Sequence, residues 1–178
     1  MKIKGLALVD LAITISDYLR KEGIETVLSG GACVSIYTHN KYISYGLDFV
    51  LISSDREKDV KNLLLKIGFY LENRYFKHLD TKYFLDFVPP PLSVGSEPVK
   101  EIKTIKKGSR TLKLLSPTDC VKDRLAAYYH WQDRQALEQA MLVCYDNPVD
   151  IVELERWSKV EGMIEQFDKI REELESIK

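Results

Sequence analysis

The sequence predicts an α+β (α/β) protein in which a mixed β-sheet is flanked by helices and followed by a C-terminal helical bundle. Residues 24–67 show strand and helix patterns in alternation, and residues 69–88 contain short apolar and aromatic runs typical of strands. Every amphipathic segment after Ser116 has helical spacing. We therefore expect an α/β domain over residues 1–115 and a helical region, packed on it, over residues 116–178.

The composition is that of a folded protein with little net charge. Hydrophobic residues make up 45% of the 178 residues, and 26 basic residues stand against 27 acidic ones. This balance gives no general attraction to nucleic acids or membranes. Cys33, Cys120 and Cys144 lack metal-ligand spacing and indicate buried thiols in a reducing compartment. Because no apolar run is long enough to span a bilayer and no signal peptide is evident, we expect a cytoplasmic protein without membrane contact.

Apolar residues at spacings of three and four predict a first helix over residues 6–22, which ends at Gly23. The residues that set this spacing are Leu8, Leu11, Ala12, Ile15 and Leu19. The next elements are a strand over residues 24–28, a helix over 32–38, a strand over 47–52 and a helix that ends at Gly68.

Ser29, Gly30 and Gly31, here called the glycine corner, connect the first predicted strand to the helix that follows. Glycines let the backbone turn sharply and let another group approach the main chain closely. The free N–H groups of the following helix point back toward this corner, where an anion such as a phosphate is favoured. Asp48 lies among apolar residues of the second strand, and a buried unpaired carboxylate needs a compensating partner.

Strands are predicted over residues 69–71, 74–77 and 83–88, the last ending at Pro89. Its residues Leu85-Asp86-Phe87-Val88 repeat the run Leu47-Asp48-Phe49-Val50. We interpret the repeated run as two strands that each hold one carboxylate toward the same cleft.

Residues 92–115 predict a loop and then a hairpin that turns at residues 107–109. This hairpin is the one locally basic segment, and its cationic residues are Lys100, Lys103, Lys106, Lys107, Arg110 and Lys113. A solvated face is the simpler interpretation. Contact with nucleic acid or a triphosphate is the alternative, which predicts an affinity that falls steeply with added salt.

The C-terminal third predicts helices only. Ser116 and Pro117 are typical of a helix start, which gives a helix over residues 117–129, and Asp133 predicts the cap of a helix over 134–145. A short helix then starts at Asp150, and the last helix starts at Ser158. Its apolar seam consists of Met163, Phe167, Ile170, Leu174 and Ile177. The seam predicts packing within the chain or, alternatively, a homodimer contact through the C-terminal helix.

The order of glycine corner, short helix, Ser44 and the Asp48 strand resembles the DNA polymerase β-like nucleotidyltransferase superfamily, particularly its small AbiEii-like and minimal members. In that family a strand of the kind that holds Asp86 carries a further acidic residue. The resemblance implies a nucleotidyltransferase-like sheet that binds a nucleoside triphosphate with Mg²⁺ and transfers a nucleotide to a protein or RNA acceptor, in a toxin–antitoxin or phage-defence setting.

The resemblance also implies the site residues. Asp48 and Asp86 would be the catalytic and metal-binding residues. The nucleotide-binding residues would be Ser29, Gly30, Gly31, Ser44 and Lys122. The chain departs from the family pattern at Gly46, where the first aspartate is expected. The alternative is therefore a catalytically degenerate member that serves as a binding or regulatory module.

Overall fold

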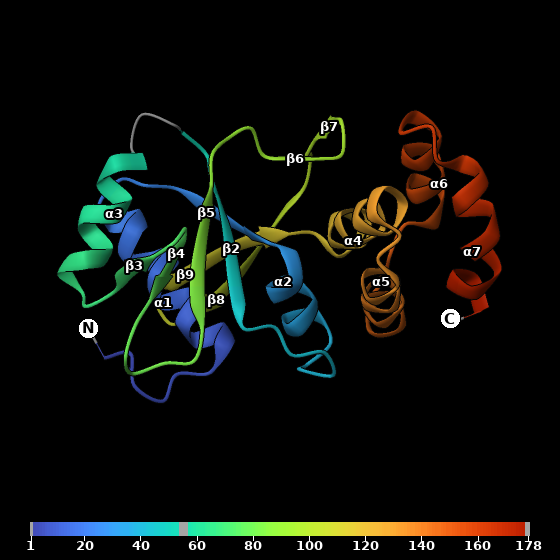
Figure 1. The fold of residues 1–178 in the computed structure, drawn as a ribbon. Coiled ribbons are helices and arrows are strands. Elements are labelled where there is room, and N and C mark those ends of the chain that lie inside the picture. Colours follow the sequence, from blue (N-terminus) through green and yellow to red (C-terminus); the bar gives the residue numbers. More distant parts are fainter. Residues whose placement is uncertain (1, 54–56, 177–178) are drawn as a thin grey trace.

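The computed structural model describes residues 2–53 and 57–176. A mixed sheet with the strand order β3-β4-β5-β2-β1-β9-β8 forms the centre of the first half (Figure 1). The strands are β1 (Thr26–Ser29), β2 (Gly46–Leu51), β3 (Tyr70–Glu72), β4 (Tyr75–Lys77), β5 (Phe84–Val88), β6 (Ser93–Val94), β7 (Glu97–Pro98), β8 (Ile102–Lys107) and β9 (Arg110–Leu115). The helices are α1 (Leu8–Lys21), α2 (Gly30–Tyr37), α3 (Glu57–Lys66), α4 (Pro117–Trp131), α5 (Arg134–Asp146), α6 (Ile151–Val160) and α7 (Ile164–Ser176).

The central strands of the sheet run in both directions. Strand β2 pairs antiparallel with β1 and parallel with β5, and β1 pairs parallel with β9. The hairpins β3–β4 and β8–β9 form the two edges of the sheet. The predicted mixed sheet flanked by helices is therefore confirmed.

Helices cover both faces of the sheet. Helices α1 and α3 lie together on one side, joined by a hydrogen bond of 3.2 Å from the Tyr18 hydroxyl to the Leu63 carbonyl. Helix α2 and the C-terminal helices lie on the other side (Figure 1). The site described below lies on the side of α2.

The C-terminal helices share one hydrophobic core with the sheet. Helices α4 and α5 pack on α2, and α6 and α7 pack beyond them. Trp157 of α6 is fully buried, stacks on Tyr129 and donates from Nε1 to the Val94 carbonyl at 3.2 Å. A division of the chain at residue 115 stays a prediction.

Several predicted helix boundaries were wrong, and the largest differences are at the end of α4 and the start of α7. Helix α4 continues to Trp131 and is followed by the cap residue Gln132, which has a left-handed φ of 53°. Ser158 does not start the last helix, because it lies within α6 with its hydroxyl 2.9 Å from that of Tyr129. Helix α7 instead begins at Ile164. The short hairpin β6–β7 was not predicted.

The apolar seam of α7 is used within the chain. Phe167, Ile170 and Leu174 are at most 3% exposed, because they face the neighbouring helices α5 and α6. These three side chains are therefore not available for a homodimer contact. Ile177, which the seam also included, lies outside the described residues.

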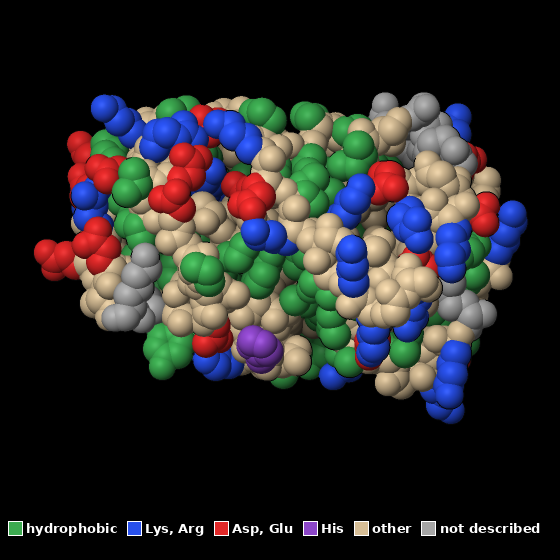
Figure 2. All heavy atoms as spheres, turned by 180° about the vertical axis from the view of Figure 1, so that it is seen from behind, with side chains coloured by type: hydrophobic (Ala, Val, Ile, Leu, Met, Phe, Trp, Pro, Cys, Tyr) green, Lys and Arg blue, Asp and Glu red, His purple; other side chains and the backbone are tan. Residues whose placement is uncertain are grey.

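The basic hairpin β8–β9 lies at the end of the sheet. Lys103, Lys107 and Lys113 form surface ion pairs with Glu101, Asp10 and Glu25. Figure 2, the view from behind, shows the Lys and Arg side chains of the α/β half separated by uncharged and apolar surface. These pairings favour the solvated face, and contact with nucleic acid stays a hypothesis. No helix within residues 2–53 and 57–176 has the length and apolar character needed to cross a membrane.

Candidate functional site

The two carboxylates that the sequence singled out lie next to each other in the sheet. Strands β2 and β5 are parallel, and their register pairs Asp48 with Asp86, so the two copies of the repeated run lie side by side. Residues paired in this way project from the same face of a sheet. Asp86 is 5% exposed and Asp48 is half-buried. The two carboxylates therefore lie next to each other in a partly buried part of the sheet.

The glycine corner lies directly against Asp48. Helix α2 begins at Gly30 itself, two residues earlier than predicted, and Gly30 has a left-handed φ of 65°. A Cβ atom on Gly30 would lie 2.2 Å from Oδ2 of Asp48, so only glycine lets the backbone approach this carboxylate. The Ser29 hydroxyl donates to the Asp48 carbonyl at 3.2 Å and holds the two strands together at this point.

Ser44 lies beside Gly31, in the loop between α2 and β2. Its N–H donates to the Ser35 hydroxyl oxygen at 2.8 Å, and its own hydroxyl donates to the Gly46 carbonyl at 2.9 Å. A Cβ atom on Gly31 would lie 3.2 Å from this hydroxyl oxygen, a close contact. Ser44 therefore supports the loop between α2 and β2, and its hydroxyl is already engaged.

A hollow of about 440 Å³, here called the first hollow, opens in front of these groups. The glycine, serine and charged residues of its wall are Gly31, Ser44, Gly46, Asp48, Arg74, Asp86 and Arg124. Of the residues that the sequence predicted for the site, Gly31, Ser44, Asp48 and Asp86 line this hollow, whereas Ser29 and Gly30 lie behind its wall beside Asp48. Arg74 is an addition that sequence analysis missed, because it stands in no recognisable pattern with the aspartates, and Arg124 comes from the helix in which the resemblance places polar residues that face the cleft.

The charges in the first hollow are unevenly balanced. Burial, together with the negative charge of Asp86, raises the pKa of Asp48 to about 6. Arg74 forms an ion pair with Oδ2 of Asp86, while its side chain stays 68% exposed. Arg124 donates from Nε to Asp123 at 3.1 Å, so part of its charge is already balanced. Asp48 is consequently the carboxylate in the hollow that gains most from an added cation.

An aromatic ring covers the position at which the resemblance expects a further aspartate. Gly46 pairs with Phe84 on the neighbouring strand, and a Cβ atom on Gly46 would lie 2.8 Å from the Phe84 ring. The ring also contacts that of Tyr75, with the centroids 4.8 Å apart. A side chain at position 46 would therefore need the space that Phe84 fills.

We expect Gly46→Asp to lower the free energy of unfolding by about 2 kcal/mol, because the new side chain overpacks against Phe84. The double substitution Gly46→Asp with Phe84→Ala should be more stable than the sum of the single effects predicts, because removing the ring makes room for the carboxylate. Urea unfolding of the three variants and the unaltered protein measures this coupling. Strictly additive effects would contradict the contact.

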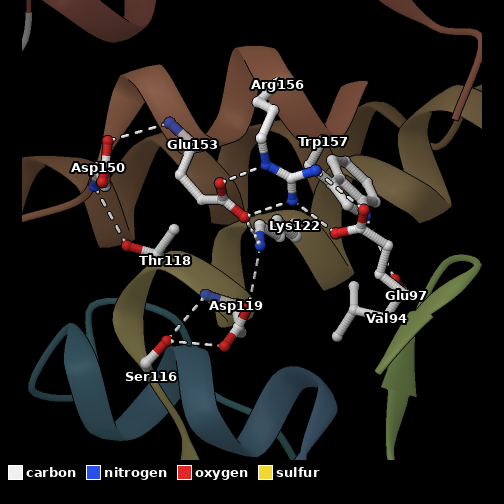
Figure 3. Close-up of polar contacts among 10 residues, drawn as sticks. All are labelled: Val94, Glu97, Ser116, Thr118, Asp119, Lys122, Asp150, Glu153, Arg156 and Trp157. Atoms are coloured by element: carbon white, nitrogen blue, oxygen red, sulfur yellow. Dashed lines mark hydrogen bonds and ion pairs between the residues drawn. The ribbon is translucent and has the colours of Figure 1, made fainter. Parts of the chain in front are cut away.

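Lys122 does not line the first hollow, which corrects its predicted place in the nucleotide site. It is 7% exposed and forms ion pairs with Asp119 at 3.1 Å and Glu153 at 2.8 Å (Figure 3). It lines a separate hollow of about 260 Å³. The face of α4 that carries Lys122 points toward α6, because Leu125 and its apolar neighbours set the orientation of the helix.

The Lys122 contacts belong to a larger ion-pair network that ties hairpin β6–β7 to α6. Arg156 lies between Glu153, at 2.6 Å from Nε, and Glu97, at 2.6 Å from Nη2 (Figure 3). The hydrogen bonds from Arg156 and Lys122 lower the pKa of Glu153 to about 2. The contacts of Glu153 in this network therefore contribute to stability only while Glu153 is ionised.

We expect the stability contribution of Glu153 to disappear at low pH. Since its folded pKa lies below the ordinary value of 4.5, the contribution is present above pH 4.5 and is lost as the pH falls toward 2. Solvent screens the ion pairs of Glu153, because their side chains are partly exposed. Glu153→Gln should therefore lower the free energy of unfolding by only about 1 kcal/mol at pH 7. The difference from the unaltered protein should shrink toward zero near pH 2.5 in urea unfolding. A difference that does not depend on pH would contradict this role.

Within the part of the chain that the structure describes, no group of three or more His, Cys, Asp or Glu side chains could hold a metal ion. The pair Asp48 and Asp86 nevertheless suits one hard cation whose remaining ligands come from a bound molecule and water.

The fold is that of nucleotidyltransferase-like proteins. An antigenic nucleotidyltransferase-like protein from Paracoccidioides brasiliensis superposes with a TM-score of 0.69 at 12% identity, over 97% of this chain and 94% of that one. A crystal structure of ANT(2'')-Ia in complex with adenylyl-2''-tobramycin gives a TM-score of 0.50 at 15% identity, over 88% and 97% of the chains. Its solution structure gives 0.50 at 14% identity, over 95% and 94%.

No protein-family model matches the sequence, and no curated protein matches it. The similarity to solved structures confirms the nucleotidyltransferase-like fold that the sequence resemblance implied. Membership of the AbiEii-like branch stays a prediction.

Proposed function

We propose that the first hollow binds a nucleoside triphosphate together with one divalent cation. The observation that supports this most strongly is the in-register pair of Asp48 and Asp86 in front of the glycine corner. Such an arrangement offers a cation two carboxylates and offers the phosphates the N–H groups at the start of α2. Ser29, Gly30 and Gly31 would form the phosphate side of the site, with Ser44 as a supporting residue.

Asp48 and Asp86 fit Mg²⁺, which binds proteins through one or two carboxylates and takes its other ligands from substrate phosphates and water. Bound there, the ion would neutralise charge on the triphosphate. The raised pKa of Asp48 reflects burial and repulsion by Asp86, and an added cation would relieve that repulsion. Arg74 and Arg124 add positive charge on the other walls of the hollow.

The reaction that this site would support is nucleotidyl transfer. An acceptor oxygen would form a bond to the α-phosphorus of the nucleotide while the bond between that phosphorus and the β-bridging oxygen breaks. Pyrophosphate would leave with the bonding electrons, and the acceptor proton would pass to solvent. Transfer to a protein or RNA acceptor, and a role in a toxin–antitoxin or defence system, stay hypotheses.

A nucleotide-binding module without transferase activity is the second candidate. Two observations favour it. The Phe84 ring fills the space beside Gly46 where a further carboxylate would stand, and Arg74 already neutralises Asp86. Both reduce the negative charge available for metal ions, so the site could bind a nucleotide and regulate a partner.

Calorimetric titration tests the shared part of both candidates. ATP, GTP, CTP and UTP are titrated with and without Mg²⁺ into the unaltered protein, Asp48→Asn and the control Asp80→Asn, whose carboxylate lies in an exposed turn outside the hollow. We expect Mg²⁺-dependent binding of at least one nucleotide, weakened at least tenfold by Asp48→Asn only. No binding, or equal binding in all three proteins, would overturn the proposal.

Transfer is tested separately. The nucleotide that binds is supplied with a label on its γ-phosphate, and release of labelled pyrophosphate is followed in the presence of candidate acceptors. Release that Asp48→Asn abolishes supports the transferase. Binding without release from any acceptor supports the regulatory module.

A further inference from the structure

A second hollow adjoins the first and is larger, at about 690 Å³. It lies between α3 and the strands β3 to β5. Arg74 and Asp86 line both hollows, so their ion pair stands at the boundary. Because the second hollow opens on the α3 side of the sheet and the first on the α2 side (Figure 1), a molecule in the second hollow would reach the first only past this ion pair.

Apolar side chains form most of the second hollow. Val60 and Phe76 are buried at its base, whereas Leu71 and Val88 are 42% and 38% exposed at its rim. Phe87 is half-buried between them. Exposed apolar residues gathered around a concavity are typical of a binding site for an apolar group.

The charged residues of the second hollow are mainly cationic. Lys58 and Lys61 stand three positions apart on α3, which places them on the same face of the helix. Neither forms an ion pair with another described residue. With Arg74 opposed only by Asp86, the hollow has an excess of positive charge and would favour an anionic group.

We propose that the second hollow holds the acceptor of the nucleotide and that this acceptor is a small apolar molecule with an anionic group. The acceptor role rests on the proposed function. A concavity of this volume suits a small molecule better than a macromolecular surface. Apolar residues would bind the body of the acceptor, and Lys58, Lys61 and Arg74 would bind its anionic group.

Nuclear magnetic resonance of the ¹⁵N-labelled protein tests the ligand class with three matched probes. These are 1-naphthyl phosphate, uncharged 1-naphthol and cationic 1-naphthylmethylamine. We expect the phosphate to shift the amide signals of Val60, Leu71 and Val88 and to bind at least tenfold more tightly than the amine, with the naphthol between them. Equal affinities, or shifts confined to other parts of the chain, would overturn the proposal.

Variants on α3 provide a matched comparison. Lys61→Gln should weaken binding of 1-naphthyl phosphate about threefold to tenfold and leave 1-naphthol binding unchanged. Lys66→Gln, which alters an exposed lysine of the same helix outside the hollow, should change neither affinity. An equal loss in both variants would contradict a specific anion contact.

Adding the nucleotide and Mg²⁺ separates failure of this proposal from failure of the proposed function. Shifts at Gly30 and Gly31 caused by the nucleotide, with no probe binding in the second hollow, overturn the acceptor site but leave nucleotide binding intact. Probe binding without any nucleotide binding overturns the acceptor role together with the proposed function. Simultaneous binding of both supports the acceptor site, whereas displacement of the probe by the nucleotide overturns it.

Discussion

Gly30→Ala should weaken nucleotide binding at least tenfold and lower the free energy of unfolding by about 2 kcal/mol. The left-handed φ of 65° at Gly30 is unfavourable for alanine. The added methyl group would also lie 2.2 Å from Oδ2 of Asp48, so the carboxylate must move away from the glycine corner. Calorimetry and urea unfolding measure the two effects.

Gly108→Ala separates backbone strain from crowding. Gly108 has a similar φ of 62°, but a Cβ atom there would meet nothing within 4 Å. This control should lose about 1 kcal/mol of stability and bind the nucleotide normally. If Gly30→Ala behaves like Gly108→Ala in both measurements, the close approach of the helix start to Asp48 does not matter for the site.

Trp157→Ala should destabilise the protein by about 3–5 kcal/mol, the range for removing a large buried aromatic side chain. Trp157 is 0% exposed, stacks on Tyr129 with ring centroids 6.0 Å apart, and donates a hydrogen bond to hairpin β6–β7. Trp157→Phe should cost about 1–2 kcal/mol, because it keeps most of the packing but leaves the Val94 carbonyl unpaired.

Trp131→Ala is the control for this prediction, since Trp131 is 82% exposed at the end of α4. It should change the free energy of unfolding by less than about 0.5 kcal/mol. Chemical unfolding followed by far-ultraviolet circular dichroism measures all three variants. Similar losses for Trp131→Ala and Trp157→Ala would mean that α6 contributes little to the common core.

Much of the fold was predictable because its signals are local. The period of apolar residues in α1 and the caps of α4 and α5 each depend on residues a few positions apart. The predicted caps are present, since Ser116 accepts a hydrogen bond from Asp119 N–H and Asp133 accepts one from Ala136 N–H. The prediction failed at Ser158, because an acceptable cap residue was instead buried against Tyr129. Tertiary packing there outweighed the local pattern.

The site was predictable only in part, because its residues come together through contacts between segments that are far apart in the sequence. The repeated run predicted that Asp48 and Asp86 face one cleft, and both line the first hollow, whereas Lys122 lies outside it because the sequence does not show which face of α4 meets which neighbour. Arg74 was missed because its contact with Asp86 joins a turn to a strand twelve positions later. Only the fold of β3–β4 against β5 brings these two residues together.

The sequence alone determined the kinds and order of all elements except the short hairpin β6–β7, together with the glycine corner and the strands that hold the two aspartates. These features follow from backbone preferences and apolar periodicity, which act over a few residues. Only the tertiary structure decided that β5 lies beside β2 in the register that pairs Asp48 with Asp86, and that Phe84 covers Gly46. Pairing between strands depends on how the helices and the core fill space across the whole chain, so no single segment of the sequence contains that information.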